Sequence, residues 1–181
     1  FDVGEQGQDF IGKRAGRGLG GLDHATVAVL DMGKTNVKLS AVTADGHVLE
    51  TTSTPNPVLP GPPWRHHDLQ GLGDWVLCEL ASLCHRHPVS QFITSGHGSG
   101  GVLTGGDPDA PGGGAALPMI DYEQEVPEGL NEAYEALSGS FLDRGSATLQ
   151  AATHQGRQMY WMQRAEPRKF EAARWYLNVP Q

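Results

Sequence analysis

The sequence predicts an α/β fold that starts with three antiparallel strands joined by tight hairpins and continues into helices packed on a sheet. Two observations lead to this prediction. Over residues 26–50, apolar and polar residues alternate with a period of two between turns rich in Gly, Asp and Asn. Over residues 69–86, apolar residues recur at steps of three and four, as in a helix with one buried face.

The three predicted strands follow one another closely. An apolar run at residues 27–30 ends in Asp31, and a polar turn follows at residues 32–36. A second alternating stretch covers residues 37–42, and an Asp-Gly pair, a strong hairpin signal, leads to a third run at residues 47–50. The order strand, hairpin, strand, hairpin, strand follows from these patterns.

The first turn carries the chemistry that the phosphates of a nucleotide require. A glycine lets backbone N–H groups approach an anion, hydroxyl and amide side chains donate hydrogen bonds, and cations add charge. The residues of these types are Gly33, Thr35, Asn36, Lys34 and Lys38. Asp31 offers the hard oxygen ligand that Mg²⁺ prefers, directly or through water. An ordinary hairpin with a polar turn remains the alternative.

The tripeptide Gly33-Lys34-Thr35 also matches a relaxed P-loop. That motif needs a flexible loop between a strand and a helix, so that phosphate lies at the helix N-terminus. Here the preceding residues belong to a strand, and no helical pattern appears before residue 69. We therefore reject the P-loop interpretation.

Proline is dense over residues 55–68, which predicts an extended surface loop rather than a helix. Its last residue, Asp68, is expected to cap the helix at residues 69–86. We interpret His66 and His67 beside it as part of a capping cluster on a solvated loop. A metal site is the less favoured alternative, because no further ligands lie at metal-site spacing.

Three shorter elements are predicted beyond this helix. Strands at residues 91–94 and 101–104 enclose a turn dense in glycine. After the glycine-rich segment 105–114, which we expect to be a mobile loop without chemistry, an apolar run at residues 116–120 ends in Asp121. This run is predicted to be a further strand.

The C-terminal part is predicted to be helical. Residues 127–137 begin with a proline and carry an apolar face. Two short helices follow at residues 154–164 and 167–177, separated by a Glu-Pro pair. We interpret most of their aromatic side chains as core, and keep Gln158 and Trp161 as candidates for the edge of a pocket.

The first hairpin resembles the phosphate-binding hairpin of the actin-like ATPase superfamily, and most closely that of the FGGY carbohydrate kinases. Asp31, Gly33, Thr35 and Lys38 occupy the places of the family's Asp-x-Gly-Thr turn and following cation. Lys34 stands where many members have Thr or Ser, although a Gly-Lys-Thr-Asn version resembles a subgroup of sugar kinases. The aromatic residue and the His-Asp pair before the long helix, and the Ser-Gly-His-Gly turn, add to the likeness.

The resemblance implies an incomplete actin-like (ribonuclease H-like) domain with a mixed sheet, and ATP-dependent phosphorylation of a sugar hydroxyl with Mg²⁺. The resemblance implies that Asp31 organises the metal ion. It also implies that the other polar residues of the turn bind the phosphates. His97, with Ser99 as second choice, and Asp121 with Glu123 would contact the sugar. The sequence departs from the family's Gln-Met-His-Gly and Trp-x-Asp-x-Arg motifs, so the resemblance does not identify the sugar.

The resemblance covers roughly residues 25–181, whereas family members are more than twice as long. We therefore expect residues 25–181 to be the N-terminal portion of the first kinase domain, without the catalytic base and the adenosine pocket. Residues 1–24 are expected to be a poorly ordered leader or linker. On this interpretation the 181 residues alone are inactive. The alternative is a fragment that acts at most as a sugar-binding or interaction module.

Composition narrows the classes of partner. The 13 basic and 21 acidic residues give a net charge of −8, which argues against nucleic acid as a partner. No apolar run approaches the roughly 20 residues of a membrane span. Two cysteines six residues apart in a predicted helix, without an export signal, favour the cytoplasm. The oligomeric state is left open, a homodimer included.

Overall fold

The computed structural model describes residues 25–107, 110, 114–147 and 149–181. Its main sheet has the order β3-β2-β1-β6. The strands are β1 (Thr26–Met32), β2 (Asn36–Thr43), β3 (Val48–Pro55) and β6 (Val89–Gly96). The first three pair antiparallel and β6 pairs parallel with β1, so the sheet is mixed. The predicted three-stranded start is confirmed.

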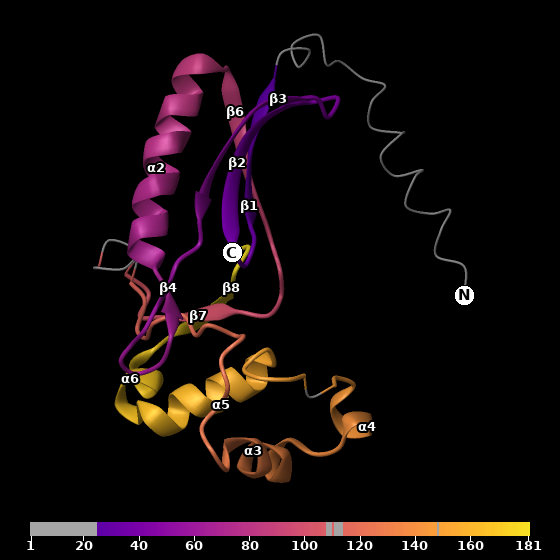
Figure 1. Ribbon diagram of the computed structural model, residues 1–181, viewed down its shortest axis with the longest axis vertical. Coiled ribbons are helices and arrows are strands. Elements are labelled where there is room, and N and C mark those ends of the chain that lie inside the picture. Colours follow the sequence, from indigo (N-terminus) through magenta and orange to yellow (C-terminus); the bar gives the residue numbers. More distant parts are fainter. Residues whose placement is uncertain (1–24, 108–109, 111–113, 148) are drawn as a thin grey trace.

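Helix α2 (Leu69–Arg86) covers one face of this sheet (Figure 1). Asp68 caps it as predicted, because its carboxylate accepts a hydrogen bond of 3.0 Å from the Gly71 N–H. Alternate residues of β1 and β2 meet the apolar face of α2 in the first core, which comprises Ala28, Leu30, Val37, Leu39, Ala41, Leu72 and Leu83. Leu77 and Cys84 of α2 lie outside this face and are exposed.

The remaining strands and helices form the second half of the molecule, at one end of the main sheet, and most of them are short (Figure 1). Its strands are β4 (Val58–Leu59), β5 (His66–His67), β7 (Gly101–Thr104) and β8 (Trp175–Asn178). Its helices are α3 (Leu130–Ser138), α4 (Phe141–Arg144), α5 (Gln155–Ala165) and α6 (Pro167–Ala172). Strands β4 and β5 form one antiparallel pair, and β7 and β8 form another.

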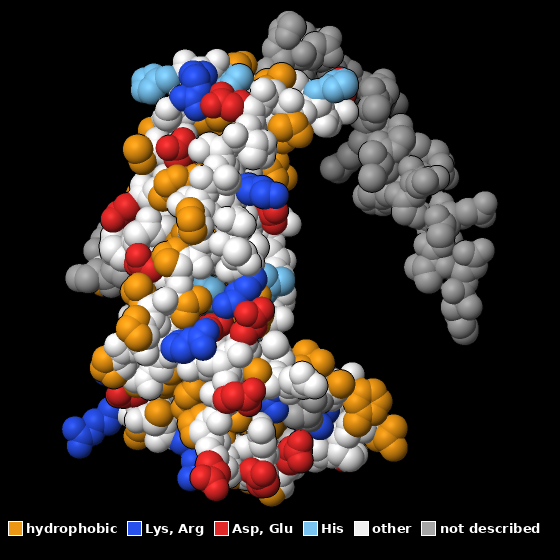
Figure 2. All heavy atoms as spheres, viewed as in Figure 1, with side chains coloured by type: hydrophobic (Ala, Val, Ile, Leu, Met, Phe, Trp, Pro, Cys, Tyr) orange, Lys and Arg blue, Asp and Glu red, His pale blue; other side chains and the backbone are white. Residues whose placement is uncertain are grey.

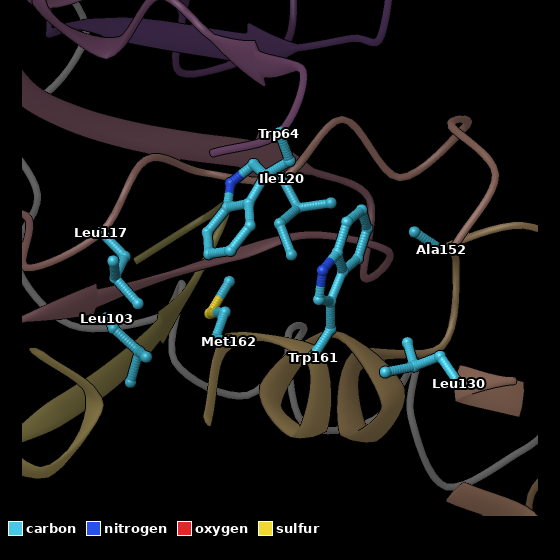
Figure 3. Packing of buried hydrophobic residues seen from close by; sticks show 8 residues of the cluster. All are labelled: Trp64, Leu103, Leu117, Ile120, Leu130, Ala152, Trp161 and Met162. Carbon is cyan, nitrogen blue, oxygen red and sulfur yellow. The ribbon is translucent and has the colours of Figure 1, made fainter. Parts of the chain in front are cut away.

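A second core holds this half together (Figure 3). Its buried members come from many separate segments: Trp64, Leu103, Leu117, Ile120, Leu130, Ala152, Trp161 and Met162. The rings of Trp64 and Trp161 are tilted to each other, with centroids 5.5 Å apart. The indole N–H of Trp64 donates to the Pro118 carbonyl at 2.9 Å, so the buried ring keeps its polar atom satisfied.

Two predicted elements are wrong. The helix expected over residues 167–177 ends at Ala172, and the chain then extends as β8, because residues 175–178 find hydrogen-bond partners in β7. The apolar run at residues 116–120 forms no strand; only Ile120 makes an isolated bridge, to His66. Of the proline-rich loop, the ends form β4 and β5. The expectation for residues 1–24 lies outside the described residues, as does part of that for segment 105–114.

Candidate functional site

The turn between β1 and β2 is closed by its glycine. The Gly33 N–H donates to the Asn36 carbonyl at 3.1 Å. A Cβ added at Gly33 would lie 2.8 Å from the same carbonyl oxygen, closer than real Cβ atoms approach. The structure therefore gives a reason for this glycine that the sequence did not suggest. It permits the tight turn, and its N–H is already used within it.

Asp31 and Lys38 lie opposite each other in the β1–β2 pair, and Ser95 of β6 lies on the other side of Asp31. The Asp31 side chain is exposed and makes no hydrogen bond or ion pair with another described residue. Thr35 and Asn36 are exposed as well. The exposed carboxylate and the two donor side chains at one end of the sheet are suited to a metal ion and to phosphate oxygens.

Lys34 has a different environment from the one that we predicted. Its ammonium group lies 2.6 Å from the Asp121 carboxylate and 3.5 Å from that of Glu123. It also lies over the ring of Tyr122, 5.4 Å from the centroid. Lys34 thus links the turn to the segment that we predicted would contact the sugar, across 87 positions of the sequence.

Asp121 is the buried centre of this site, with a side chain that is 0% exposed. It pairs with Lys34 through one oxygen and with the Arg65 guanidinium through the other. Burial alone would raise the pKa of Asp121, but the hydrogen bonds from Lys34 and the Glu123 N–H and the charges of Lys34 and Arg65 outweigh it and lower the pKa. The carboxylate is therefore ionised, as a buried acid with two cationic partners should be.

His97 lies beside this cluster, in the glycine-rich turn after β6. Its ring meets the Tyr122 ring edge-on, with centroids 4.7 Å apart. The Ser99 N–H points at Nδ1 of His97 at 3.3 Å, which makes Nδ1 the acceptor and leaves Nε2 as the protonated nitrogen of the neutral ring. Burial and the charge of Lys34 lower the pKa of His97, although Glu123 opposes them. The ring is thus a neutral hydrogen-bond donor beside the acidic cluster.

Trp161 belongs to the second core, and Gln158 is buried beside Ala152 of that core, so neither lies at the surface of this site. Trp161 lines a separate pocket with Leu130 and Arg164. Gln158 is 0% exposed, and its amide donates to the carbonyls of Ser99, at 2.7 Å, and Ala152. Gln158 therefore supports the turn that carries Ser99 and His97. Trp161 is 7% exposed and packs against Trp64.

The sequence did not reveal four residues of the site: Asn56, Arg65, His67 and Tyr122. Arg65 and His67 lie in the proline-rich segment, which we interpreted as a solvated loop. Burial of His67, which is only 3% exposed, contradicts that interpretation. The available signal was the position of a cation and two histidines directly before a helix. Nothing local showed that Arg65 would pair with Asp121 or that His67 would contact Asn56.

On the face shown in Figure 2, Lys and Arg side chains meet Asp and Glu side chains near the middle of the molecule. Within the part of the chain that the structure describes, no group of three or more His, Cys, Asp or Glu side chains is placed to hold a metal ion. A Mg²⁺ ion at Asp31 would therefore depend on phosphate oxygens and water for its other ligands.

None of the described helices is both long and apolar enough to cross a membrane.

Solved structures of carbohydrate kinases are similar to this chain. A carbohydrate kinase from Novosphingobium aromaticivorans is 30% identical with a TM-score of 0.76, and the match covers 88% of this chain and 32% of that one. A xylulose kinase from Rhodospirillum rubrum is 21% identical with a TM-score of 0.62, over 83% and 32%. A glycerol kinase from Plasmodium falciparum, solved with ADP, is 11% identical with a TM-score of 0.58, over 82% and 30%.

The chain spans about one third of the length of these kinases. No protein-family model matches it, and no curated protein matches its sequence. The fold and the resemblance predicted from the sequence, an actin-like ATPase architecture of the sugar-kinase type, are confirmed by the solved structures.

Proposed function

Because the chain is similar to FGGY-type carbohydrate kinases over most of its length and has their fold, we propose that it binds Mg·ATP and a sugar for phosphoryl transfer to a sugar hydroxyl. The whole reaction would need groups beyond those that these residues supply, since the chain spans about one third of the similar kinases. Its contribution would be to position the triphosphate, the metal ion and the sugar.

The phosphate part of the proposal rests on the exposed polar groups at the end of β1 and the start of β2. Asp31 would hold Mg²⁺, directly or through water, while Thr35 and Asn36 donate to phosphate oxygens and Lys38 adds positive charge. The bound Mg·ATP would supply the phosphoryl group and the charge neutralisation that its transfer requires. Gly33 would keep the turn narrow enough for this arrangement.

The sugar part rests on the cluster around Asp121. A carboxylate has about four lone-pair positions, and Lys34, Arg65 and the Glu123 N–H already use some of those of Asp121. Glu123, whose side chain is 59% exposed, and the neutral His97 are more accessible for sugar hydroxyls. Ser99 would contribute from the same turn as His97.

The observation that carries the proposal is the ion pair between Lys34 of the turn and Asp121 of the acidic segment, at 2.6 Å. It brings the predicted phosphate turn within one side-chain length of the predicted sugar contacts. A phosphoryl donor and its acceptor hydroxyl must be close together for transfer, and this arrangement meets that requirement.

The proposal is tested with Asp31→Asn in a calorimetric titration with Mg·ATP. We expect the affinity for Mg·ATP to fall by about 10–100-fold, because the amide cannot replace a metal-organising carboxylate. Asp74→Asn is the matched control, since Asp74 lies exposed on α2, and it should leave the affinity unchanged. Equal affinities for Asp31→Asn and the unaltered protein would refute the assignment.

A sugar-binding or interaction module without transfer is the second candidate. It is favoured by the engagement of Lys34 with Asp121, which removes one cation from the phosphate turn. For either function we propose a cytoplasmic location, which is compatible with the free, exposed thiols of Cys78 and Cys84. Binding of a sugar without any binding of Mg·ATP would support this second candidate.

A further inference from the structure

We propose that Asn56 and His67 are positioning residues that hold the β1–β2 turn in one conformation, with His67 donating from Nδ1. The inference rests on the proposed function in one respect, since a fixed turn matters to catalysis only if the turn binds phosphate. The clamp itself is defined by contacts on three segments: the turn at residues 32–36, the residue after β3, and β5.

Asn56 binds the turn at two points. Its backbone N–H donates to the Thr35 carbonyl at 2.8 Å, and its side-chain amide donates to the Gly33 carbonyl at 2.9 Å. Asn56 reaches both because Pro55, the residue before it, pairs with Asn36 at the end of β3. Two carbonyl oxygens of the turn are therefore satisfied by one residue, which fixes the orientation of the peptide units between them.

The side-chain amide of Asn56 determines the tautomer of His67. Because the NH₂ group of Asn56 donates to Gly33, its Oδ1 is an acceptor, and it lies 3.0 Å from Nδ1 of His67. Nδ1 must therefore carry the proton, an assignment made from the hydrogen-bond network. Burial, followed by the charge of Lys34, lowers the pKa of His67 to about 4, so at neutral pH the ring is uncharged and Nε2 carries a lone pair.

His67 in turn is fixed to the acidic segment. Its backbone N–H donates to the Met119 carbonyl at 3.1 Å, two residues before Asp121. The turn is thus tied to that segment twice, directly through Lys34 and indirectly through Asn56 and His67. The charged and titratable groups that act on the ring come from several elements: Lys34, Asp121, His97 and His66.

The second ring nitrogen permits a sharp test. Nε2 of His67 is buried and has no hydrogen-bond partner among the described residues. His67 also lines a small cavity with Met32, His97 and Met119. The clamp depends on Nδ1 and not on Nε2, so substitutions that mimic one nitrogen or the other should differ in effect.

The experiment compares His67→Asn, whose amide nitrogen can stand in for Nδ1, with His67→Gln, whose amide nitrogen stands in for Nε2. Amide hydrogen exchange is measured at Gly33 and Asn56, whose N–H groups donate to the carbonyls of Asn36 and Thr35. The tautomer of His67 is read from nitrogen-15 chemical shifts. We expect the Nδ1–H tautomer, exchange about tenfold faster in His67→Gln, and a change below about threefold in His67→Asn. His47→Gln, an exposed histidine in another turn, is the control.

Unchanged exchange at Leu39 and Leu83, in the first core, would show that each variant is folded. The Nε2–H tautomer, or equal exchange in His67→Gln and the unaltered protein, would overturn the clamp. Affinity for Mg·ATP is measured separately in the same proteins, where we expect it to fall about tenfold in His67→Gln only. If the unaltered protein does not bind Mg·ATP, the proposed function fails while the exchange data still decide the clamp.

Discussion

The two cores of this molecule are built in different ways. The first, between α2 and the main sheet, comes from residues 28–83, and neighbouring elements in the sequence are neighbours in space. The second draws on segments from Trp64 to Met162, most of which have no regular period. The comparison shows that one half of the molecule is specified by local patterns and the other by contacts between distant segments. The charged site lies where the two halves meet.

The largest expected effects are losses of stability on substitution in either core, and local hydrogen exchange should distinguish the two cores. Trp161→Ala should lower the free energy of unfolding by about 3–5 kcal/mol, and Leu39→Ala by about 2–5 kcal/mol, because each removes a large buried side chain. Hydrogen exchange should rise mainly in α5 and β7 for the first variant and in β1 and β2 for the second. Leu142→Ala, at a residue 89% exposed, should change stability by no more than about 0.5 kcal/mol.

If both core variants instead accelerate exchange equally throughout the described residues, the two halves unfold as one unit and the distinction between them is structural only. Urea unfolding followed by tryptophan fluorescence gives the free energies for this comparison.

The next effect concerns the contact between the halves. Asp121→Asn should destabilise the protein by about 2–3 kcal/mol, because it leaves Lys34 and Arg65 without their buried partner. In a double-mutant cycle with Lys34→Met, we expect a coupling energy of about 1–2 kcal/mol. Additive effects of the two substitutions would show that the ion pair does not join the halves.

A smaller effect is expected from pH. The pKa of His67 is lowered to about 4, from 6.5, by burial and then by Lys34. Between these two values the unfolded chain binds a proton that the folded chain does not, so stability should fall as pH falls from 6.5 towards 4, by no more than about 3 kcal/mol. Burial also lowers the pKa of His97 and His154 and adds to the same trend. His67→Asn should flatten the slope, and an unchanged slope would contradict the assignment.

The sequence alone predicted the elements of the half that contains the first core. Alternation predicted β1, β2 and β3, and steps of three and four predicted α2 and its cap at Asp68. In the other half, the chain after Ala172 carries aromatic residues that fit a helix, but it forms β8 because β7, about 70 positions earlier, offers a strand edge. The pairing of β8 with the distant strand β7 outweighed the local preference for a helix, and no local pattern predicts that pairing.

Prediction of the site shows the same division. The residues of the turn could be proposed together because one hairpin contains them all, and Asp121 could be proposed because it ends an apolar run. Arg65 and His67 were assigned to a solvated loop, although both lie within the site. Their roles depend on Asp121 and Asn56, and a sequence without related sequences does not show which distant acid or amide a cation or histidine will meet.

The central claim is that the β1–β2 turn and the acidic segment form one ligand site. Its most direct test is an amide chemical-shift titration, first with Mg·ATP and then with each member of a panel of sugars and polyols. We predict that Mg·ATP shifts the amides of residues 33–36 and that the sugar shifts those of His97 and residues 121–123. Shifts confined to other parts of the molecule, such as the surroundings of Trp161, would contradict the account.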